Sequence, residues 1–143
     1  MPLERKYPPV GPYLVGREKI REFADAIGAS DPAHRDLTAA QARGYPDLVA
    51  PPTFPIVVTL TSGRPVFEDP ELGLDFSRVV HGQQRFRYVR PVFAGDELTG
   101  TCILEDVISR GGSDFVSTRT EVTAPGGELV LTAWAKLVVR GKD

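Results

Sequence analysis

The spacing of hydrophobic positions changes along the chain, from a helical repeat in the first third to an alternating one in the second half. Between residues 17 and 27 the apolar side chains recur every three or four positions and share one stripe. These residues are Ile20, Phe23, Ala24 and Ile27. Gly28 follows, and glycine commonly terminates helices. The pattern predicts a helix over Arg17–Ile27.

A second, short helix is expected from Thr38 to Arg43, with the Asp36 side chain as its N-terminal cap. The next segment, Ala50 to Ser62, is ambiguous. Its β-branched residues favour a strand, whereas Pro55 suits a first helical turn and apolar residues on nearly every side are typical of a buried helix. The pattern alone leaves both interpretations open.

After Asp75 the sequence contains four runs of strand length separated by turn residues. The runs are Val79–Val89, Leu98–Ser109, Asp114–Thr123 and Leu129–Arg140. In the last run every second residue from Leu129 to Val139 is apolar, and the opposite row is mixed. This alternation is typical of a sheet with one covered face. Helices followed by an antiparallel meander predict an α+β fold, with a helix packed on one face of the sheet.

The bulk composition narrows the classes of protein. With 143 residues, of which 41% are hydrophobic and 25% charged, the chain is expected to form a single soluble domain over 1–143. A net charge of −2 gives no reason to expect binding to nucleic acid or to an anionic membrane. No apolar run resembles a signal peptide or a membrane span, and the single cysteine, Cys102, fits a reducing, cytoplasmic location as a buried structural thiol. Two histidines and one cysteine form no metal-ligand cluster, so no metal site is expected.

The candidate chemistry centres on His34, one of two histidines, which follows Asp31 in a loop. An imidazole with an ordinary pKa of about 6.5 beside a carboxylate is suited to general acid–base catalysis. The alternatives are structural. Asp31 suits an Asx turn, Asp36 suits a helix cap, and His34 on a proline-containing loop has neighbours to which it can hydrogen-bond.

The chain resembles the MaoC-like hot-dog hydratases and dehydratases, which interconvert (3R)-hydroxyacyl and trans-2-enoyl thioesters. The resemblance covers nearly the whole chain: residues 13–20, the loop 23–36, Ala-Pro-Pro-Thr-Phe at 50–54 and the long segment 79–96. Within the family the chain is most similar to short proteins that resemble the non-catalytic subunit of heterodimeric (3R)-hydroxyacyl-carrier-protein dehydratases. The resemblance implies a single hot-dog domain, in which a curved antiparallel sheet wraps around a buried central helix. It therefore favours a helix over Thr53–Ser62.

The resemblance also bears on whether Asp31 and His34 form a catalytic acid–base pair. Active members carry a loop Gly-Asp-x-Asn-Pro-[Leu/Ile]-His, and Gly28, Pro32 and His34 match its glycine, proline and histidine. Ala29 stands at the catalytic aspartate and Asp31 at the asparagine, so the dyad is incomplete. Helper subunits commonly have tyrosine at the histidine position, and the chain departs from that pattern too. His34 and Asp31 remain the candidate catalytic residues.

The resemblance places substrate binding at the opening of the central helix, where backbone N–H groups stabilise the developing enolate oxygen. Prolines have no N–H, so the donors there would be those of residues such as Thr53 or Phe54. His81 and Gly82, near the start of a predicted strand, are expected to line the acyl tunnel, although an ordinary strand histidine is at least as compatible with the pattern. The candidate substrate-binding residues are Ala50, Pro51, Pro52, Thr53, Phe54, His81 and Gly82.

An arginine-rich stretch follows, in which Arg85, Arg87 and Arg90 alternate with aromatic residues. It suits either the phosphates of coenzyme A, or an acidic acyl carrier protein, or an ordinary solvated strand face. No cofactor is expected beyond the coenzyme A or carrier protein that carries the thioester.

Three functions follow as hypotheses. The leading one is a dehydratase subunit that binds the acyl chain while a MaoC-like homologue supplies an intact dyad. The second is an independently active homodimeric hydratase that uses His34, and the third is a catalytically silent protein that binds acyl thioesters. The first two require an acyl thioester substrate and a dimer, either with a second copy or with a homologue. The sequence leaves open whether the chain is itself a hydro-lyase.

Overall fold

The computed structural model describes residues 4–141 and contains one six-stranded antiparallel sheet. Its order is β1-β4-β5-β6-β3, and β2 also pairs with β4. The strands are β1 (Arg5–Lys6), β2 (Val10–Leu14), β3 (Val79–Tyr88), β4 (Glu97–Arg110), β5 (Ser113–Thr123) and β6 (Leu129–Val139). The four longest are the strands expected from the alternating pattern. The two N-terminal strands, β1 and β2, were not foreseen.

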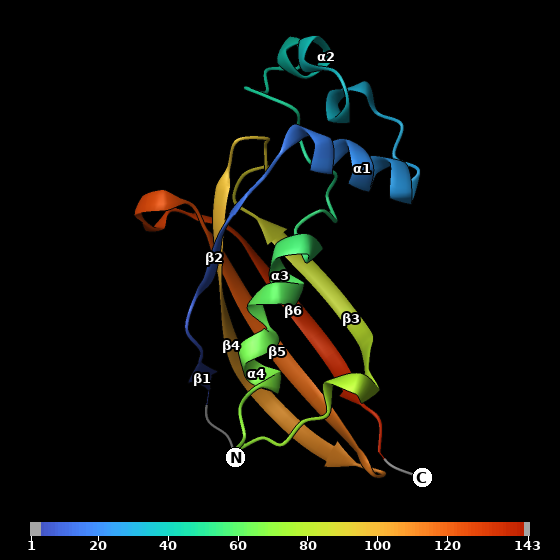
Figure 1. Cartoon of the computed structure of the whole chain (residues 1–143), viewed down its shortest axis with the longest axis vertical. Helices are drawn as coiled ribbons and strands as arrows, with labels where there is room; N and C mark the ends of the chain where they lie inside the picture. The colour runs from blue at the N-terminus through green and yellow to red at the C-terminus, as the bar shows by residue number, and fades with distance from the viewer. Residues whose placement is uncertain (1–3, 142–143) are drawn as a thin grey trace.

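The helices gather on one face and at one end of the sheet (Figure 1). They are α1 (Arg17–Ile27), α2 (Leu37–Ala42), α3 (Ile56–Ser62) and α4 (Arg64–Phe67), with 3₁₀ turns η1 (Pro32–His34), η2 (Phe76–Arg78) and η3 (Pro125–Gly127). α3 and α4 run along the inner face of the sheet, while α1, η1 and α2 lie beyond the N-terminal end of α3 (Figure 1). None of the helices in the part of the chain that the structure describes has the length and hydropathy needed to cross a bilayer.

α1 confirms the helix predicted from the apolar stripe. Ile20 and Ala24 are fully buried, and the ring of Phe23 packs edge-on against Phe54 at a centroid distance of 5.4 Å. Gly28 ends the helix in the left-handed region, at a φ of 71°. One member of the stripe differs: Ile27 is 50% exposed, because it lies at the last turn, beyond the contact with the core.

The central helix is shorter than expected. Thr53 lies in a turn, and α3 begins at Ile56 after Pro55, which occupies the N-cap position. α3 ends after seven residues at Gly63, and α4 continues in the same direction along the sheet (Figure 1). The helical interpretation of this segment is therefore confirmed, whereas its predicted bounds, Thr53–Ser62, are too early at the start.

α3 approaches the sheet closely at one point. A Cβ atom added to Gly100 of β4 would overlap Ser62 Oγ and lie 2.8 Å from Ser62 Cβ. Glycine at this position lets the helix backbone come near the strand, as expected for a glycine inside a strand where another segment approaches. The contact fixes the height of α3 above the sheet.

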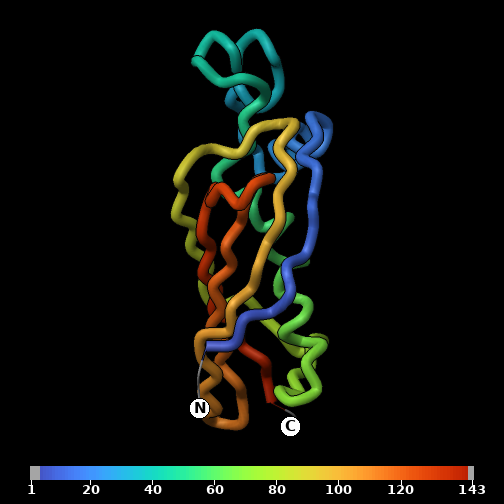
Figure 2. Tube along the Cα trace, turned by 90° about the vertical axis from the view of Figure 1, so that its left-hand side faces the viewer, coloured from blue at the N-terminus to red at the C-terminus, as the bar shows by residue number. Residues whose placement is uncertain are grey.

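The lengths of the strands are set by their turns. β4 and β5 are joined by Gly111 and Gly112, whose φ values of 60° and 81° are both positive. A two-residue hairpin turn with positive φ at both positions matches the twist of the flanking strands, and glycine adopts it without strain. The strands run side by side over their full length (Figure 2).

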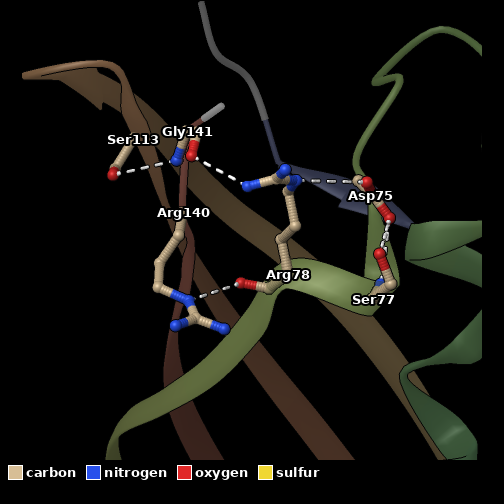
Figure 3. Close-up of polar contacts among 6 residues, drawn as sticks. All are labelled: Asp75, Ser77, Arg78, Ser113, Arg140 and Gly141. Carbon is tan, nitrogen blue, oxygen red and sulfur yellow. Dashed lines mark hydrogen bonds and ion pairs between the residues drawn. The ribbon is translucent and has the colours of Figure 1, made fainter. Parts of the chain in front are cut away.

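Hydrogen bonds connect η2 to the segment that follows β6 and hold it beside the sheet (Figure 3). Arg78 Nη1 donates a hydrogen bond to the carbonyl oxygen of Gly141 at 3.0 Å, and the N–H of Gly141 donates to Ser113 Oγ at 3.3 Å. η2 also carries Phe76, whose ring meets Phe67 of α4 at a centroid distance of 5.2 Å. These contacts hold η2 against α4, near the inner face of the sheet.

The interior consists of two hydrophobic clusters. One gathers α1, η1 and α2 around the start of the central helix and includes Phe54 and Leu131. The other lies between α4 and the far half of the sheet and includes Val66 and Leu137. Cys102 belongs to the second cluster and is fully buried, so the expected burial of its thiol is confirmed.

Candidate functional site

A cavity of about 240 Å³ lies between α3, α4 and the inner face of the sheet. Its apolar wall includes Ile56, Leu60, Phe67, Phe76, Ala133 and Leu137. Ala133 belongs to the first hydrophobic cluster and Leu137 to the second, so residues of both clusters line the cavity. Its volume is slightly below the roughly 300–1,000 Å³ typical of sites for drug-sized ligands, which suits a short or narrow apolar group.

The cavity also has a polar side, formed by side chains from α3, β3 and β5. These are Thr59, His81, Gln84, Thr118 and Thr120. The two β5 threonines are buried and hydrogen-bond the thiol of Cys102, whose pKa burial raises above its ordinary value. Of the residues predicted to bind substrate, His81 alone lines this cavity within the described chain.

The orientation of the His81 ring follows from its neighbours. The Gln84 amide nitrogen donates to the Trp134 carbonyl at 3.1 Å, which directs its amide oxygen to His81 Nε2, also at 3.1 Å. An amide oxygen only accepts, so Nε2 carries the proton. In the neutral ring the lone pair is therefore on Nδ1.

His34 lies in η1 and is buried, with 8% of its surface exposed. Its Nδ1 is 2.8 Å from the backbone oxygen of Val49. A carbonyl oxygen only accepts, so Nδ1 donates, and the lone pair of the neutral ring is on Nε2. The ring is fixed by the backbone and not by a carboxylate, and His34 does not line the cavity.

Asp31 has other partners. Its Oδ1 accepts the backbone N–H of Ala33 at 3.0 Å, as an Asx-type cap of η1, and its Oδ2 accepts from Arg43 at 2.6 Å. The Arg43 guanidinium is the main cause that lowers the pKa of Asp31 below its usual range, followed by the Ala33 hydrogen bond. The structural interpretation of Asp31 matches these contacts, and its catalytic role stays a prediction.

Two arginines that sequence reasoning did not single out hold this loop. Arg43 pairs with Asp31, and Arg35 donates to the backbone oxygen of Ala29 at 2.6 Å and also pairs with Asp25. Ala29, which the sequence resemblance aligns with the catalytic aspartate of active members, offers only a methyl group. Asp36 caps α2 by accepting the N–H of Ala39 at 3.0 Å, as predicted.

The segment before α3 lies apart from the cavity. Ala50, Pro51 and Phe54 are buried, whereas Pro52 and Thr53 are exposed. The N–H of Phe54 already donates to the oxygen of Pro51 at 2.9 Å, so of the two expected donors Thr53 alone has no backbone acceptor among the described contacts.

β3 carries Gly82, the last of the predicted substrate-binding residues, and Tyr88, which was not predicted. Tyr88 donates its hydroxyl to the oxygen of Pro52 at 2.7 Å, which ties the segment before α3 to β3. Gly82 lies where the pairing of β3 with β6 is irregular. Sequence reasoning missed Thr59, Gln84, Thr118 and Thr120. Alternation along β5 was the available signal for the last two.

The three arginines of the arginine-rich stretch, two in β3 and one just after it, make separate contacts. Arg85 lies over the ring of Trp134, 4.3 Å from its centroid, and Arg90 forms a two-point pair with Asp96. Arg87 is exposed.

The curved antiparallel sheet, wrapped around a short central helix, defines a hot-dog fold. Comparison with known proteins agrees. The model of the family described as FAS1-like, dehydratase domain region, matches residues 5–133, and the chain belongs to that family.

Curated relatives match over nearly their whole length. A UPF0336 protein of Streptomyces coelicolor is 55% identical over 139 residues, covering 97% of this chain and 93% of the relative. A UPF0336 protein of Saccharopolyspora erythraea is 51% identical over 146 residues, covering 99% and 94%.

Solved structures agree as well. A chain of the HadBC (3R-hydroxyacyl-ACP dehydratase) complex of Mycobacterium tuberculosis is 36% identical, with a TM-score of 0.80 over 95% of this chain and 94% of that one. A MaoC-like dehydratase is 32% identical, with a TM-score of 0.84 over 98% of this chain and 42% of the other.

Proposed function

We propose that the chain is a subunit of a (3R)-hydroxyacyl-thioester dehydratase that binds the acyl chain beside a catalytic MaoC-like homologue. The observation that carries the proposal is Ala29 at the acid position, with no substitute carboxylate on His34. Asp31 accepts hydrogen bonds from Arg43 and from the N–H of Ala33, and the His34 ring donates one to the Val49 carbonyl. The HadBC dehydratase, which was solved as a complex, supports assembly with a homologue.

The chemistry explains why the missing acid matters. Dehydration of a β-hydroxy thioester removes a proton from the α-carbon and delivers one to the departing hydroxyl, usually with the help of two positioned groups. A partner with an intact aspartate and histidine supplies both. In this proposal the chain contributes the cavity beside α3, whose apolar wall accepts the acyl chain. The thioester is carried by coenzyme A or by an acyl carrier protein.

The test is to measure hydration of crotonyl-coenzyme A, by loss of enoyl-thioester absorbance, with the chain alone and with a homologue that has the intact loop. We expect no turnover from the chain alone, and turnover from the mixture above that of the homologue alone. Ala29→Asp and Ala29→Asn form a matched pair: a gain limited to the aspartate variant would identify the missing acid. Robust turnover by the unmodified chain without a partner would overturn the proposal.

A second candidate is an independently active homodimer that uses His34. The observation in its favour is that the lone pair of the neutral His34 ring is on Nε2, the nitrogen that the Val49 contact leaves uncommitted. In that case the unmodified chain turns over crotonyl-coenzyme A alone, and His34→Ala abolishes the reaction while His81→Ala does not. A fully active His34→Ala protein excludes this candidate.

The third candidate, a silent binding protein, is distinguished by the same measurements. It predicts saturable binding of an acyl thioester in equilibrium dialysis, with no turnover by the chain alone and none in the mixture beyond that of the homologue alone. Turnover by the chain alone, or turnover of the mixture above that of the homologue alone, excludes it.

A further inference from the structure

His81 stands at the open side of the cavity between α3, α4 and the sheet. Its backbone pairs with Leu137, so its side chain lies on the inner face of the sheet beside another residue of the cavity wall. His81, Leu60 and Phe76 are exposed, whereas Thr118 and Leu137 are buried. The cavity therefore opens between β3, α3 and η2, and His81 is part of its mouth.

The His81 ring keeps one nitrogen for a ligand. Nε2 donates to the Gln84 amide oxygen, so the lone pair of the neutral ring is on Nδ1. Among the described residues none donates a hydrogen bond to this nitrogen. The hydroxyls of Thr118 and Thr120, deeper in the wall, bond the Cys102 thiol instead. Nδ1 of His81 is thus an acceptor at the mouth of a largely apolar cavity.

The chemistry of an acyl thioester decides which of its groups can pair with this lone pair. In the proposed function the acyl chain fills the apolar cavity, so the thioester lies near the mouth. The thioester has oxygen and sulfur but no N–H or O–H, and it cannot donate to Nδ1. The next polar group outward is a secondary amide, two carbons from the sulfur. Coenzyme A and the pantetheine arm of an acyl carrier protein share this amide, and its N–H is a donor.

We propose that His81 Nδ1 accepts a hydrogen bond from the pantetheine amide N–H nearest the thioester sulfur, and so positions the thioester at the mouth of the cavity. The inference rests on the proposed function, in which the cavity receives the acyl chain. It gives His81 a role in binding, separate from proton transfer. A 3-hydroxyl, the other donor on a substrate, lies on the acyl side of the thioester, and the experiment distinguishes the two.

The test compares equilibrium dissociation constants of the whole protein, with its homologue where assembly requires it, at pH 8, where an imidazole of ordinary pKa is neutral. The probes are S-octanoyl-N-acetylcysteamine and its acetoxyethyl counterpart, in which an ester oxygen replaces the amide N–H. One net hydrogen bond predicts that the amide binds about two- to twelvefold more tightly than the ester.

Variants assign this preference to the ring nitrogen. In His81→Phe, which keeps a ring and removes the acceptor, the ratio falls to about one. His81→Asn retains the preference, because the asparagine Oδ1 is as many bonds from the backbone as Nδ1. Gln83→Ala is the matched control: Gln83 is exposed and pairs with Lys136 on the opposite face of β3, so the preference stays intact.

Two further ligands identify the source of the amide. Of octanoyl-coenzyme A and an octanoyl-loaded acyl carrier protein, the one that binds more tightly is the natural form of the ligand. His81→Phe should weaken its binding by the same two- to twelvefold factor, because both forms contain the amide. Unchanged affinity of both forms in His81→Phe contradicts the proposed contact.

The outcomes separate the two proposals. No binding of any octanoyl thioester defeats the proposed function itself. Equal binding of the amide and the ester by the unmodified protein overturns the role of His81, and so does a preference that survives in His81→Phe. A preference for the (3R)-hydroxyoctanoyl over the octanoyl thioester, without any amide preference, would assign Nδ1 to the hydroxyl instead. The comparison within the unmodified protein is decisive even if a variant fails to fold.

Discussion

The two histidines are held in opposite tautomers. His34 donates from Nδ1 to a backbone oxygen, whereas His81 donates from Nε2 to the Gln84 amide. In the neutral rings the free lone pair is therefore Nε2 on His34 and Nδ1 on His81. A base must present its lone pair to the substrate, so the two residues cannot exchange roles without reorganising these contacts.

Tyr7 gives a prediction for alkaline pH. Its side chain is buried and donates to Asp69 at 2.7 Å. Burial, followed by the hydrogen bond to Asp69, raises the pKa of Tyr7 to about 12. In the unfolded chain the Tyr7 phenol ionises near pH 10. The stability that its raised pKa contributes to the folded protein is therefore complete below about pH 10 and is lost as the pH rises towards 12. We expect a loss of at most about 2–3 kcal/mol in unfolding free energy.

Urea unfolding between pH 8 and 12 checks this. Tyr7→Phe, which cannot ionise, should lose less stability across the same interval, and the difference isolates Tyr7 from groups that titrate in both proteins. Parallel curves for the two proteins would show that Tyr7 does not contribute.

The contacts of the loop that contains Asp31 and His34 were only partly predictable from the sequence. Short-range roles, such as Asp36 capping α2, follow from local spacing, and they were predicted. The pairing of Asp31 with Arg43 depends on the path of the chain through η1 and α2, twelve positions apart, and no local pattern reports it.

Among the secondary-structure elements, those with a long and regular hydrophobic pattern could be predicted from the sequence. The strands from β3 to β6 each span at least ten residues with clear turns, and they were predicted to within about two residues. β1 has two residues and β2 contains Gly11 and Pro12, so neither shows an alternating pattern. The central helix was recognised through its family resemblance. Its late start reflects Pro51, Pro52 and Pro55, which favour turns before a helix begins.

The approach of α3 to β4 yields a stability prediction. Gly100→Ala would place a Cβ atom on Ser62 Oγ and 2.8 Å from Ser62 Cβ. The helix must shift away, and overpacking of this kind typically costs about 1–3 kcal/mol. We expect chemical denaturation to show a loss of that size, partly recovered in a Gly100→Ala, Ser62→Ala double variant because the nearest clashing atom is gone.

Gly63 is the matched control for this experiment. Its φ of −84° suits any residue, and a Cβ atom there would be no closer than 3.7 Å to its neighbours. Gly63→Ala should leave stability unchanged or raise it by about 0.4–1 kcal/mol. Equal losses for the two glycine variants would contradict a specific contact at Gly100.

At the scale of the whole molecule, the sheet has an uncovered edge. β3 pairs with β6 on one side, and no other strand of the described chain pairs with its second side. Ten residues of open edge are a ready template for a partner strand, whereas the opposite edge is formed by the shorter strands β1 and β2, of two and five residues. Leu60 and Phe76, which line the cavity, are 56% and 64% exposed, so the cavity wall also lacks cover in the isolated chain.

Assembly through β3 therefore predicts a localised change in hydrogen exchange. When the homologue is added, or the concentration of the chain is raised if it pairs with itself, the outward amides of Val79–Tyr88 should exchange at least about tenfold more slowly, because they become hydrogen-bonded across the new interface. Peptides from α1 serve as the internal control, since α1 lies away from this edge (Figure 1). Mass spectrometry of exchange at matched times measures both. A stable complex in which exchange of β3 is unchanged would place the interface elsewhere on the molecule.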